Sequence, residues 1–417
     1  MTIREIEAYE ILASGGYPTV AVTVTLDSGH TGKASVPSGA SAGSHEAAVL
    51  MDGDKHRYHG KGMLQAVQNV LEKIAPAVSN LNPEDQRAID NAMIALDGTP
   101  NKSTLGGNAI LAVSLAVAKA VAKAKNQQLY QHIRETYQIS SPLKLPNPMV
   151  VVIEGGKHAD DTTDLQEYCM TGLGDTSPTE NIRKSLESYH TLKKVLKAEN
   201  LSTNVGNEGA FAPNGIPSNE APFKYIIQAI EQAGYLPGTD IGISIDAAAS
   251  EFYQDGEYNL VVENRILTAH ELSQYYQTWL EKYPIATIED MFHEDDWQAW
   301  IDFQPIANRF NVPHIGDDLT VTNVTRLQQA IDKKAISGIL IKLNQIGTLT
   351  ETVDTCVLAK QHNLLVVPSH RGGGETNDAS MVDLAVAVGG DYIKVGPTRG
   401  ERVSKYNRLM AIERQLS

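Results

Sequence analysis

Short apolar runs recur through the last two thirds of the chain, and each is followed by a stretch with the residue spacing of a helix. Runs this apolar are typical of strands in a parallel sheet that is buried on both faces. Repeated strand–helix units over this length predict a (β/α)8 barrel. The runs are Val150–Ile153, Ile241–Ile245, Ile285–Ile288, Val312–Ile315, Ile339–Ile341, Leu364–Val367 and Asp391–Ile393.

A doubly wound open sheet is the competing architecture for alternating strands and helices. It would place a glycine-rich phosphate-binding fingerprint after the first strand. No such fingerprint is present in the sequence. The barrel is therefore the favoured prediction.

The first third of the chain has a different pattern, which indicates a separate α+β unit. Its predicted strands are 5–12 and 19–26, joined by a turn at 15–18, and its predicted helices are 63–74, 86–96 and 108–124. A proline-rich passage at 142–148 follows, and the chain of 417 residues is longer than one hydrophobic core usually grows. We therefore predict an N-terminal α+β domain at 1–138 and a barrel domain at 139–417.

Composition and charge argue against several classes of protein. The formal net charge is −15 and basic residues form only short clusters, so a general surface for nucleic acid or anionic membranes is not expected. Two cysteines do not make a disulfide framework in a chain of this length. The N-terminal residues lack the apolar run of a signal peptide, and we expect no membrane span. A cytoplasmic protein that binds a small molecule is the expectation.

Six of the apolar runs end in an ionisable residue. The carboxyl ends of barrel strands converge on one mouth, where these side chains would face each other. Any one of them alone would be read as a solvated loop charge or a strand-end ion pair. Six ionisable residues at successive strand ends would cost free energy of desolvation beside apolar strands unless they have partners or a function. They are Asp246, Glu289, Asp317, Lys342, His370 and Lys394.

These residue types divide into metal ligands and a base. Asp246, Glu289 and Asp317 supply the hard oxygen ligands that suit an octahedral Mg²⁺ site. Lys342 lies beyond them, and a nearby divalent cation and a second lysine would lower its pKa toward neutrality. The metal would stabilise the intermediate formed when a proton leaves the carbon beside a carboxylate. The sequence therefore predicts proton abstraction by a magnesium enzyme.

Long and unusual motifs along almost the whole chain resemble those of the enolase family. They are SVPSGASAGSHEA, NAILAVSLAVAKA, NVGNEGAFAPN, SIDAAASEFY, IEDMFHEDDW, GDDLTVTN, LIKLNQIGTLTET, SHRGGGETND and IKVG. The resemblance implies a small α+β domain capping a modified (β/α)8 barrel. It implies a glycolytic lyase that interconverts 2-phosphoglycerate with phosphoenolpyruvate and water, and a homo-oligomer, dimeric or higher.

The resemblance also implies roles for individual residues. Asp246, Glu289 and Asp317 resemble the ligands of a tightly held Mg²⁺, and Ser41 resembles the loop serine that helps to bind a second Mg²⁺ brought with the substrate. Lys342 resembles the base that removes the C2 proton. His158 resembles the histidine of a loop that closes over the substrate. Outside the resemblance, Ser41 and His158 would be read as an ordinary loop serine and a structural histidine.

The remaining roles concern the leaving group and the two anionic ends of the substrate. Glu208, in GNEG, resembles the acid that protonates the departing C3 hydroxyl, and Glu167 resembles its partner carboxylate. Lys394 and His370 correspond to contacts with the carboxylate and phosphate ends. Arg371 is placed to grip the phosphate, for which a guanidinium fork is well suited.

The sequence departs from the family pattern near the site. The family motif Ser-His-Arg-Ser-Gly-Glu-Thr becomes Ser-His-Arg-Gly-Gly-Gly-Glu-Thr at 369–376, which removes a phosphate-binding hydroxyl. Asn207 replaces the aspartate of Gly-Asp-Glu-Gly, and the N-terminal motif Asp-Ser-Arg-Gly-Asn-Pro-Thr-Val-Glu loses its charged residues at 13–21. Further changes are at Glu154, Lys157, Ala42 and Val395.

Three functions are compatible with these observations. The first is a working glycolytic enolase with a divergent phosphate site. The second is a paralogue that uses the same proton abstraction on another phospho- or phosphono-carboxylic acid in specialised metabolism. The third is a non-catalytic binding protein on the same scaffold, and it would predict loss of Lys342 or a metal ligand. All of those residues are retained.

Overall fold

A three-stranded antiparallel sheet opens the chain in the computed structural model, which describes residues 1–39, 43–174 and 176–417. Its strands are β1 (Ile3–Leu12), β2 (Pro18–Leu26) and β3 (Thr31–Ser35). β1 and β2 pair as the predicted hairpin, with Leu12 opposite Pro18. β2 is almost entirely buried because it is the central strand and helix α4 packs on it.

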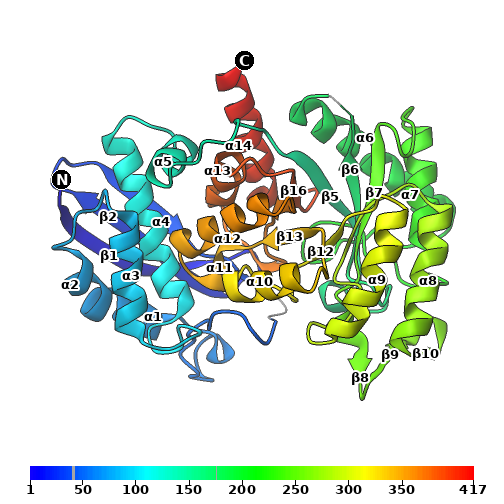
Figure 1. Cartoon of the computed structure of the whole chain (residues 1–417), viewed down its shortest axis with the longest axis horizontal. Coiled ribbons are helices and arrows are strands. Elements are labelled where there is room, and N and C mark those ends of the chain that lie inside the picture. The colour runs from blue at the N-terminus through cyan, green and yellow to red at the C-terminus, as the bar shows by residue number, and fades with distance from the viewer. Residues whose placement is uncertain (40–42, 175) are drawn as a thin grey trace.

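The helices of this unit follow the sheet (Figure 1). The predicted helix at 63–74 instead consists of α1 and a wider π-helical turn η2, and it continues into α2. Pro76 has no backbone N–H for the usual helical hydrogen bond, and the π turn lies directly before it. The elements are η1 (Tyr58–Gly60), α1 (Leu64–Asn69), η2 (Val70–Ile74), α2 (Ala75–Val78), α3 (Gln86–Asp97), α4 (Gly107–Ala124) and α5 (Leu129–Thr136).

Helix α4 is the central helix of the N-terminal unit. It contacts β2 and β3 on one side and the barrel helices α11 and α12 on the other. By length and composition alone it could cross a membrane, which the sequence prediction did not allow for, and 83% of it is buried inside the protein. A core helix meets the same criterion because it is apolar on all sides.

Eight strands form the barrel, in the order β14-β13-β12-β11-β7-β6-β5-β16. A backbone bridge between Ser369 and Lys394 links the two ends of this order, so the sheet is nearly closed. The strands are β5 (Asn147–Glu154), β6 (Glu167–Gly172), β7 (Ile241–Asp246), β11 (Ile285–Glu289), β12 (His314–Gly316), β13 (Gly338–Ile341), β14 (Leu365–Pro368) and β16 (Tyr392–Val395).

Strand β6 departs from the regular barrel. It runs antiparallel to both β5 and β7, so the barrel begins with two strands and two helices before regular strand–helix units follow. The sequence analysis did not predict β6, because its sequence Glu-Tyr-Cys-Met-Thr-Gly is a less apolar run than the others. The modified barrel expected from the family resemblance is confirmed.

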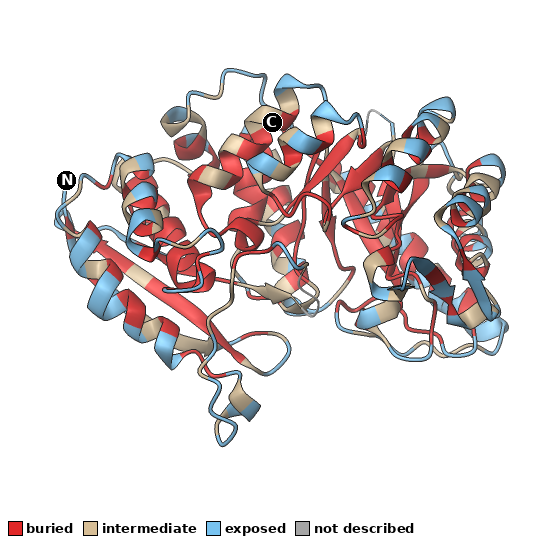
Figure 2. Cartoon of the chain, turned by 60° about the horizontal axis from the view of Figure 1, so that its bottom comes forward, coloured by how far each residue is buried: buried red, intermediate tan, exposed pale blue. Residues whose placement is uncertain are grey.

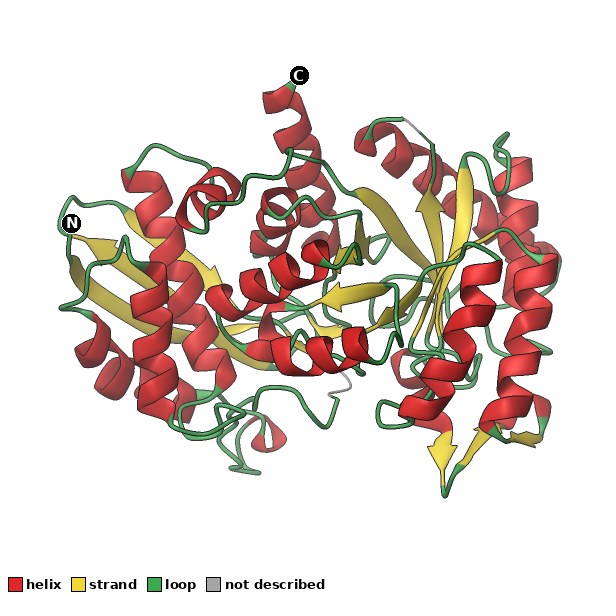
Figure 3. Ribbon diagram, viewed as in Figure 1, coloured by secondary structure: helices red, strands yellow, loops and turns green. Residues whose placement is uncertain are grey.

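Helices enclose the barrel strands, and their outward faces are exposed while the strands are buried (Figures 2 and 3). They are α6 (Pro178–Ala198), α7 (Ala221–Gln232), α8 (Ala269–Lys282), α9 (Trp297–Arg309), α10 (Val324–Asp332), α11 (Leu343–Ile346), α12 (Leu349–Gln361), α13 (Ser380–Ala387) and α14 (Gly400–Leu416). Short elements at the ends of the strands are η3 (Gly156–His158), η4 (Ala249–Phe252), β8 (Tyr253–Gln254), β9 (Glu257–Leu260), η5 (Val261–Glu263) and β10 (Arg265–Leu267).

The N-terminal unit reaches the mouth of the barrel through a small two-stranded ribbon. Strand β4 (Ser38–Gly39) pairs antiparallel with β15 (Gly373–Gly374), which follows Arg371. Segments far apart in the sequence thus form one wall beside the strand ends. The domain boundary at 138/139 stays a prediction, in the coil between α5 and β5.

Candidate active site

A ring of polar residues lies at one rim of the barrel, one from each of its eight strands. Seven come from the carboxyl ends of strands or the residues just after them. The eighth, Glu167, is the first residue of β6, and it reaches the same rim because β6 runs the other way, opposite Asp246. The ring consists of Lys394, Glu154, Glu167, Asp246, Glu289, Asp317, Lys342 and His370. Sequence and topology therefore bring all six predicted strand-end residues to one place.

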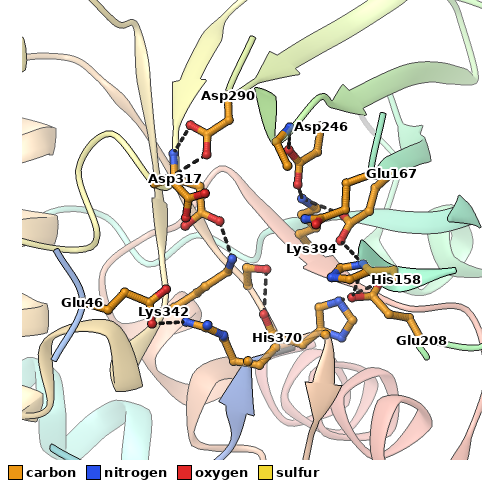
Figure 4. A pocket seen from close by; sticks show the side chains of 17 residues that line it. Glu46, His158, Glu167, Glu208, Asp246, Asp290, Asp317, Lys342, His370 and Lys394 are labelled. Atoms are coloured by element: carbon orange, nitrogen blue, oxygen red, sulfur yellow. Dashed lines mark hydrogen bonds and ion pairs between the residues drawn. The ribbon is translucent and has the colours of Figure 1, made fainter. Parts of the chain in front are cut away.

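The ammonium group of Lys394 is surrounded by three carboxylates, of which Figure 4 shows those of Glu167 and Asp246. It lies 2.7 Å from Glu167 Oε2, 3.0 Å from Asp246 Oδ2 and 2.8 Å from Glu289 Oε2. Burial raises the pKa of Asp246 and, with the negative charge of Asp246, that of Glu289, despite the Lys394 cation. One cation is thus too little charge for this group of buried acids.

Lys342 pairs with Asp317, whose other oxygen accepts a hydrogen bond of 2.7 Å from Gln345. Burial lowers the pKa of Lys342, but the surrounding carboxylates, Asp317 above all, together outweigh burial and the net pKa is raised. The predicted lowering of this pKa depends on the charge of a divalent cation and stays a prediction. A free base at position 342 requires that Asp317 turn to another cation.

The carboxylates fit a hard divalent cation. Among the described residues, seven carboxylates and only three fixed cations, Lys342, Arg371 and Lys394, line the central cavity. Asp290, Asp317 and Asp318 place ligand atoms within 4.8 Å of one another, and burial raises the pKa of Asp290 and Asp318 well above the ordinary value. Oxygen donors with excess negative charge are what Mg²⁺ prefers. Asp246, Glu289 and Asp317 remain the predicted ligands.

Glu208 lies on the other side of the cavity, between two histidines. Its carboxylate oxygens are 3.5 Å from His158 Nδ1 and 3.2 Å from His370 Nε2, and neither oxygen accepts a hydrogen bond with good geometry among the described residues. Burial raises the pKa of Glu208, but the charges of His370 and His158 outweigh burial and lower it overall. The predicted acid, its partner Glu167 and the loop histidine are thus in one cluster.

His158 is expected to stay protonated well above neutral pH. Burial lowers its pKa, but the charges of Glu208 and Glu167 outweigh burial and raise it to about 9 from 6.5. Because the folded-state pKa is the higher one, His158 contributes stability that is fully present below pH 6.5 and is lost as the pH rises through about 9.

Imidazole NMR of EDTA-treated protein checks this expectation. His314 is the internal control, since burial lowers its pKa to about 3 and it should stay neutral. Assignment comes from His158→Gln. A His158 signal that titrates near 6.5, as in an unfolded chain, would contradict the ion-pair cluster.

Arg371, the predicted phosphate ligand, is held by two glutamates. Its guanidinium donates to Glu46 Oε2 at 2.9 Å, and its backbone N–H donates to Glu375 Oε2 at 3.0 Å. Gly372 follows directly, and a Cβ atom added there would lie 2.5 Å from His158 Nε2. In this arrangement the histidine occupies the space that a side chain at position 372 would need.

Three of the sequence departures line a single cavity of about 310 Å³ behind this loop. The altered N-terminal motif contributes Ala13, Gly15 and Tyr17, and the Asp-to-Asn change contributes Asn207. The glycine insertion contributes Gly373 and Gly374. Lys61 is the only charged residue among the described lining residues. Changes that are scattered in the sequence therefore alter one region of the structure.

Sequence reasoning missed several residues of the site. Glu46 and Gln345 contact Arg371 and Asp317, and Asp290 accepts hydrogen bonds from the backbone of Asp317 and Asp318. They lie inside the motifs SHEA, LNQ and IED, so their only signal in the sequence was that they stand in motifs that resemble the family. Ser41 lies outside the described residues.

Family comparisons agree with this geometry. A model described as the enolase N-terminal domain matches residues 3–133. A model described as the enolase C-terminal TIM barrel domain matches residues 142–417. Together they span almost the whole chain, and the ring of acids and lysines lies where the matched barrel strands end. The chain belongs to the enolase family.

Proposed function

We propose that the protein is a magnesium-dependent lyase that interconverts 2-phosphoglycerate with phosphoenolpyruvate and water. The observation that carries the proposal is the placement of an amine and a carboxyl pair on opposite sides of one buried cavity, with Lys342 on one side and Glu208 with Glu167 on the other (Figure 4). The small anionic substrate, a cytoplasmic location and a homo-oligomeric state are parts of the same proposal.

The reaction would divide between these groups. Lys342 takes the C2 proton, and the electron pair of the C–H bond is held as an enolate of the substrate carboxylate. That pair then forms the C2–C3 double bond as the C3–O bond breaks. Glu208 gives a proton to the departing hydroxyl, which leaves as water. Lys394 faces the substrate carboxylate, and Arg371 with His370 holds the phosphate.

Mg²⁺ held by Asp246, Glu289 and Asp317 would supply positive charge that stabilises the substrate carboxylate as its α-proton leaves. The same charge would replace the ion pairs that these carboxylates now form with Lys394 and Lys342.

Substrate binding requires side chains to move. The cavity between Lys342 and Glu208 has a volume of only about 20 Å³, which holds about one water molecule. Separation of Lys342 from Asp317 and withdrawal of His158 from Gly372 would open space on both sides. The first contact is an ion pair between two side chains, and the second is the close approach of the His158 side chain to Gly372.

Turnover of 2-phosphoglycerate tests the proposal. The purified protein with Mg²⁺ is expected to produce phosphoenolpyruvate, followed by its ultraviolet absorbance. Absence of turnover in folded protein with metal bound would reject 2-phosphoglycerate as substrate.

Metal binding has its own expected outcome. Because the buried carboxylates exceed the cations, Mg²⁺ at about 100 times its Kd should add about 2.7 kcal/mol of stability, and EDTA should remove it. Thermal melting with and without Mg²⁺ measures the difference. Asp246→Asn should lose the response, whereas Asp255→Asn, in an exposed turn, should keep it. Identical melting curves in Mg²⁺ and EDTA would contradict the metal assignment.

The cavity behind the phosphate loop favours a second candidate function. A paralogue acting on another phospho- or phosphono-carboxylic acid would use the same Lys342 chemistry but need different space at the phosphate end. The convergence of three sequence departures on that cavity supports this reading. A binding panel of 2-phosphoglycerate, phosphonocarboxylic acids and phosphate esters of 2-phosphoglycerate discriminates the candidates, since tighter binding of a larger acid would select the paralogue.

A further inference from the structure

Glu154 is the last residue of β5, and its fully buried carboxylate holds the segment that carries Glu208. Oε1 accepts hydrogen bonds from the backbone N–H of Glu208 at 3.2 Å and of Ala210 at 3.0 Å, and Oε2 accepts a second contact from Glu208 at 3.1 Å. The backbone of β5 adds further bonds, from Glu154 N–H to Phe211 O and from Phe211 N–H to Val152 O, both 3.0 Å. The segment 206–211 is therefore attached to the barrel through Glu154.

The fit between this carboxylate and the segment is close. A Cβ atom added to Gly206 would lie 2.5 Å from Cδ of Glu154 and 2.8 Å from Oε1. A side chain at 206 would thus push the segment away from the carboxylate, so glycine permits the contact. The turn has little freedom to shift while Glu154 is in place.

A carboxyl group at this position carries an electrostatic cost. One carboxylate oxygen or imidazole nitrogen from each of Glu154, His158 and Glu208 lies within 4.8 Å of the other two. Glu167 is opposite Glu154 on the neighbouring strand. Burial and the charge of Glu208 raise the pKa of Glu154 to about 8. A neutral amide could satisfy one side of the same turn without this cost.

We propose that Glu154 is a positioning residue for Glu208, holding the main chain of the acid so that its carboxyl stays between His158 and His370. This inference rests on the proposed function, in which Glu208 protonates the leaving hydroxyl. Removal of the carboxylate leaves the segment held to β5, among the described residues, only by the two backbone bonds of Phe211, and the acid loses its alignment. Lys342 is held by β13 and does not depend on this segment.

Two partial reactions on 2-phosphoglycerate separate these effects. Exchange of the C2 proton with solvent reports Lys342, and formation of phosphoenolpyruvate reports Glu208 as well. Glu154→Ala should lower dehydration by about 10²-fold, the usual cost of a misplaced catalytic group, and change exchange by less than about threefold. Glu154→Gln should recover most of the loss, because its amide oxygen can replace Oε1, which accepts from both Glu208 and Ala210.

Glu263→Gln is the matched control. Glu263 also accepts a backbone N–H from a distant loop, that of Asn219 at 2.9 Å, but it does not line the central cavity. It should change neither rate. Equal losses of both rates in Glu154→Ala, or no loss in a variant that melts like the wild type, would overturn the inference.

A substrate-free measurement distinguishes failure of this inference from failure of the proposed function. In EDTA-treated protein with 13C-labelled glutamate, the carboxyl signal of Glu208, assigned with Glu208→Gln, should move in Glu154→Ala and stay in Glu263→Gln. If the wild type neither exchanges nor dehydrates 2-phosphoglycerate but this signal moves, the proposed substrate fails and the positioning role stands. An unmoved Glu208 signal overturns the role whatever the substrate.

Discussion

Replacing Lys342 with alanine is expected to slow exchange of the C2 proton of 2-phosphoglycerate by about 10³-fold, because a positioned general base contributes on the order of 10²–10⁴. Dehydration should fall by a similar factor, since it begins with the same proton transfer. Arg371, His370 and the metal ligands remain, so substrate binding should persist. Proton NMR in deuterated buffer measures exchange, and calorimetry measures binding.

The lysine control lies on the surface. Lys333 is exposed at the end of α10, and Lys333→Ala should leave both rates unchanged. Loss of Lys342 also leaves Asp317 without its cation, so the variant should be measured with Mg²⁺ present. Undiminished exchange in a folded Lys342→Ala protein would assign the base to another residue.

Glu208→Gln is expected to separate the two halves of the reaction. Dehydration should fall by about 10³-fold because glutamine cannot give a proton to the departing hydroxyl, while C2 exchange should continue through Lys342. His158 and His370 would also lose the charge that they face, so the pKa of His158 should fall from about 9. Rapid-quench assays, exchange measurements and imidazole NMR check the three outcomes.

A surface glutamate provides the comparison for this variant. Glu199 is exposed after α6, and Glu199→Gln should behave as the wild type. Equal losses of exchange and dehydration in Glu208→Gln would mean that the carboxylate supports the whole site rather than the leaving group.

Local patterns in the sequence were sufficient for most of the fold. The hairpin of β1 and β2 and seven barrel strands were predicted, because alternating or continuous apolar residues are a direct consequence of burial on one or two faces. Strand β6 was missed because its identity depends on pairing with β5 and β7 rather than on its own residues.

The candidate site could be predicted as a set of residues but not as a set of interactions. Strand ends pointed to Asp246, Glu289, Asp317, Lys342 and Lys394, while Glu208 and Glu167 came from the family motifs. Neither source indicated that Glu154 would hold the Glu208 segment, since a buried carboxylate at that position was visible only as a departure from a motif.

The sequence by itself determined which chemical groups stand at the barrel rim, because strand ends follow from the local apolar pattern. Only the tertiary structure decided which of those groups form ion pairs with one another. Lys394 and Asp246 are 148 residues apart in the chain but 3.0 Å apart in space, and Lys342 meets Asp317 in the same way. Ion pairing and pKa values depend on distance and burial, which are set by how the strands pack and not by their spacing in the sequence.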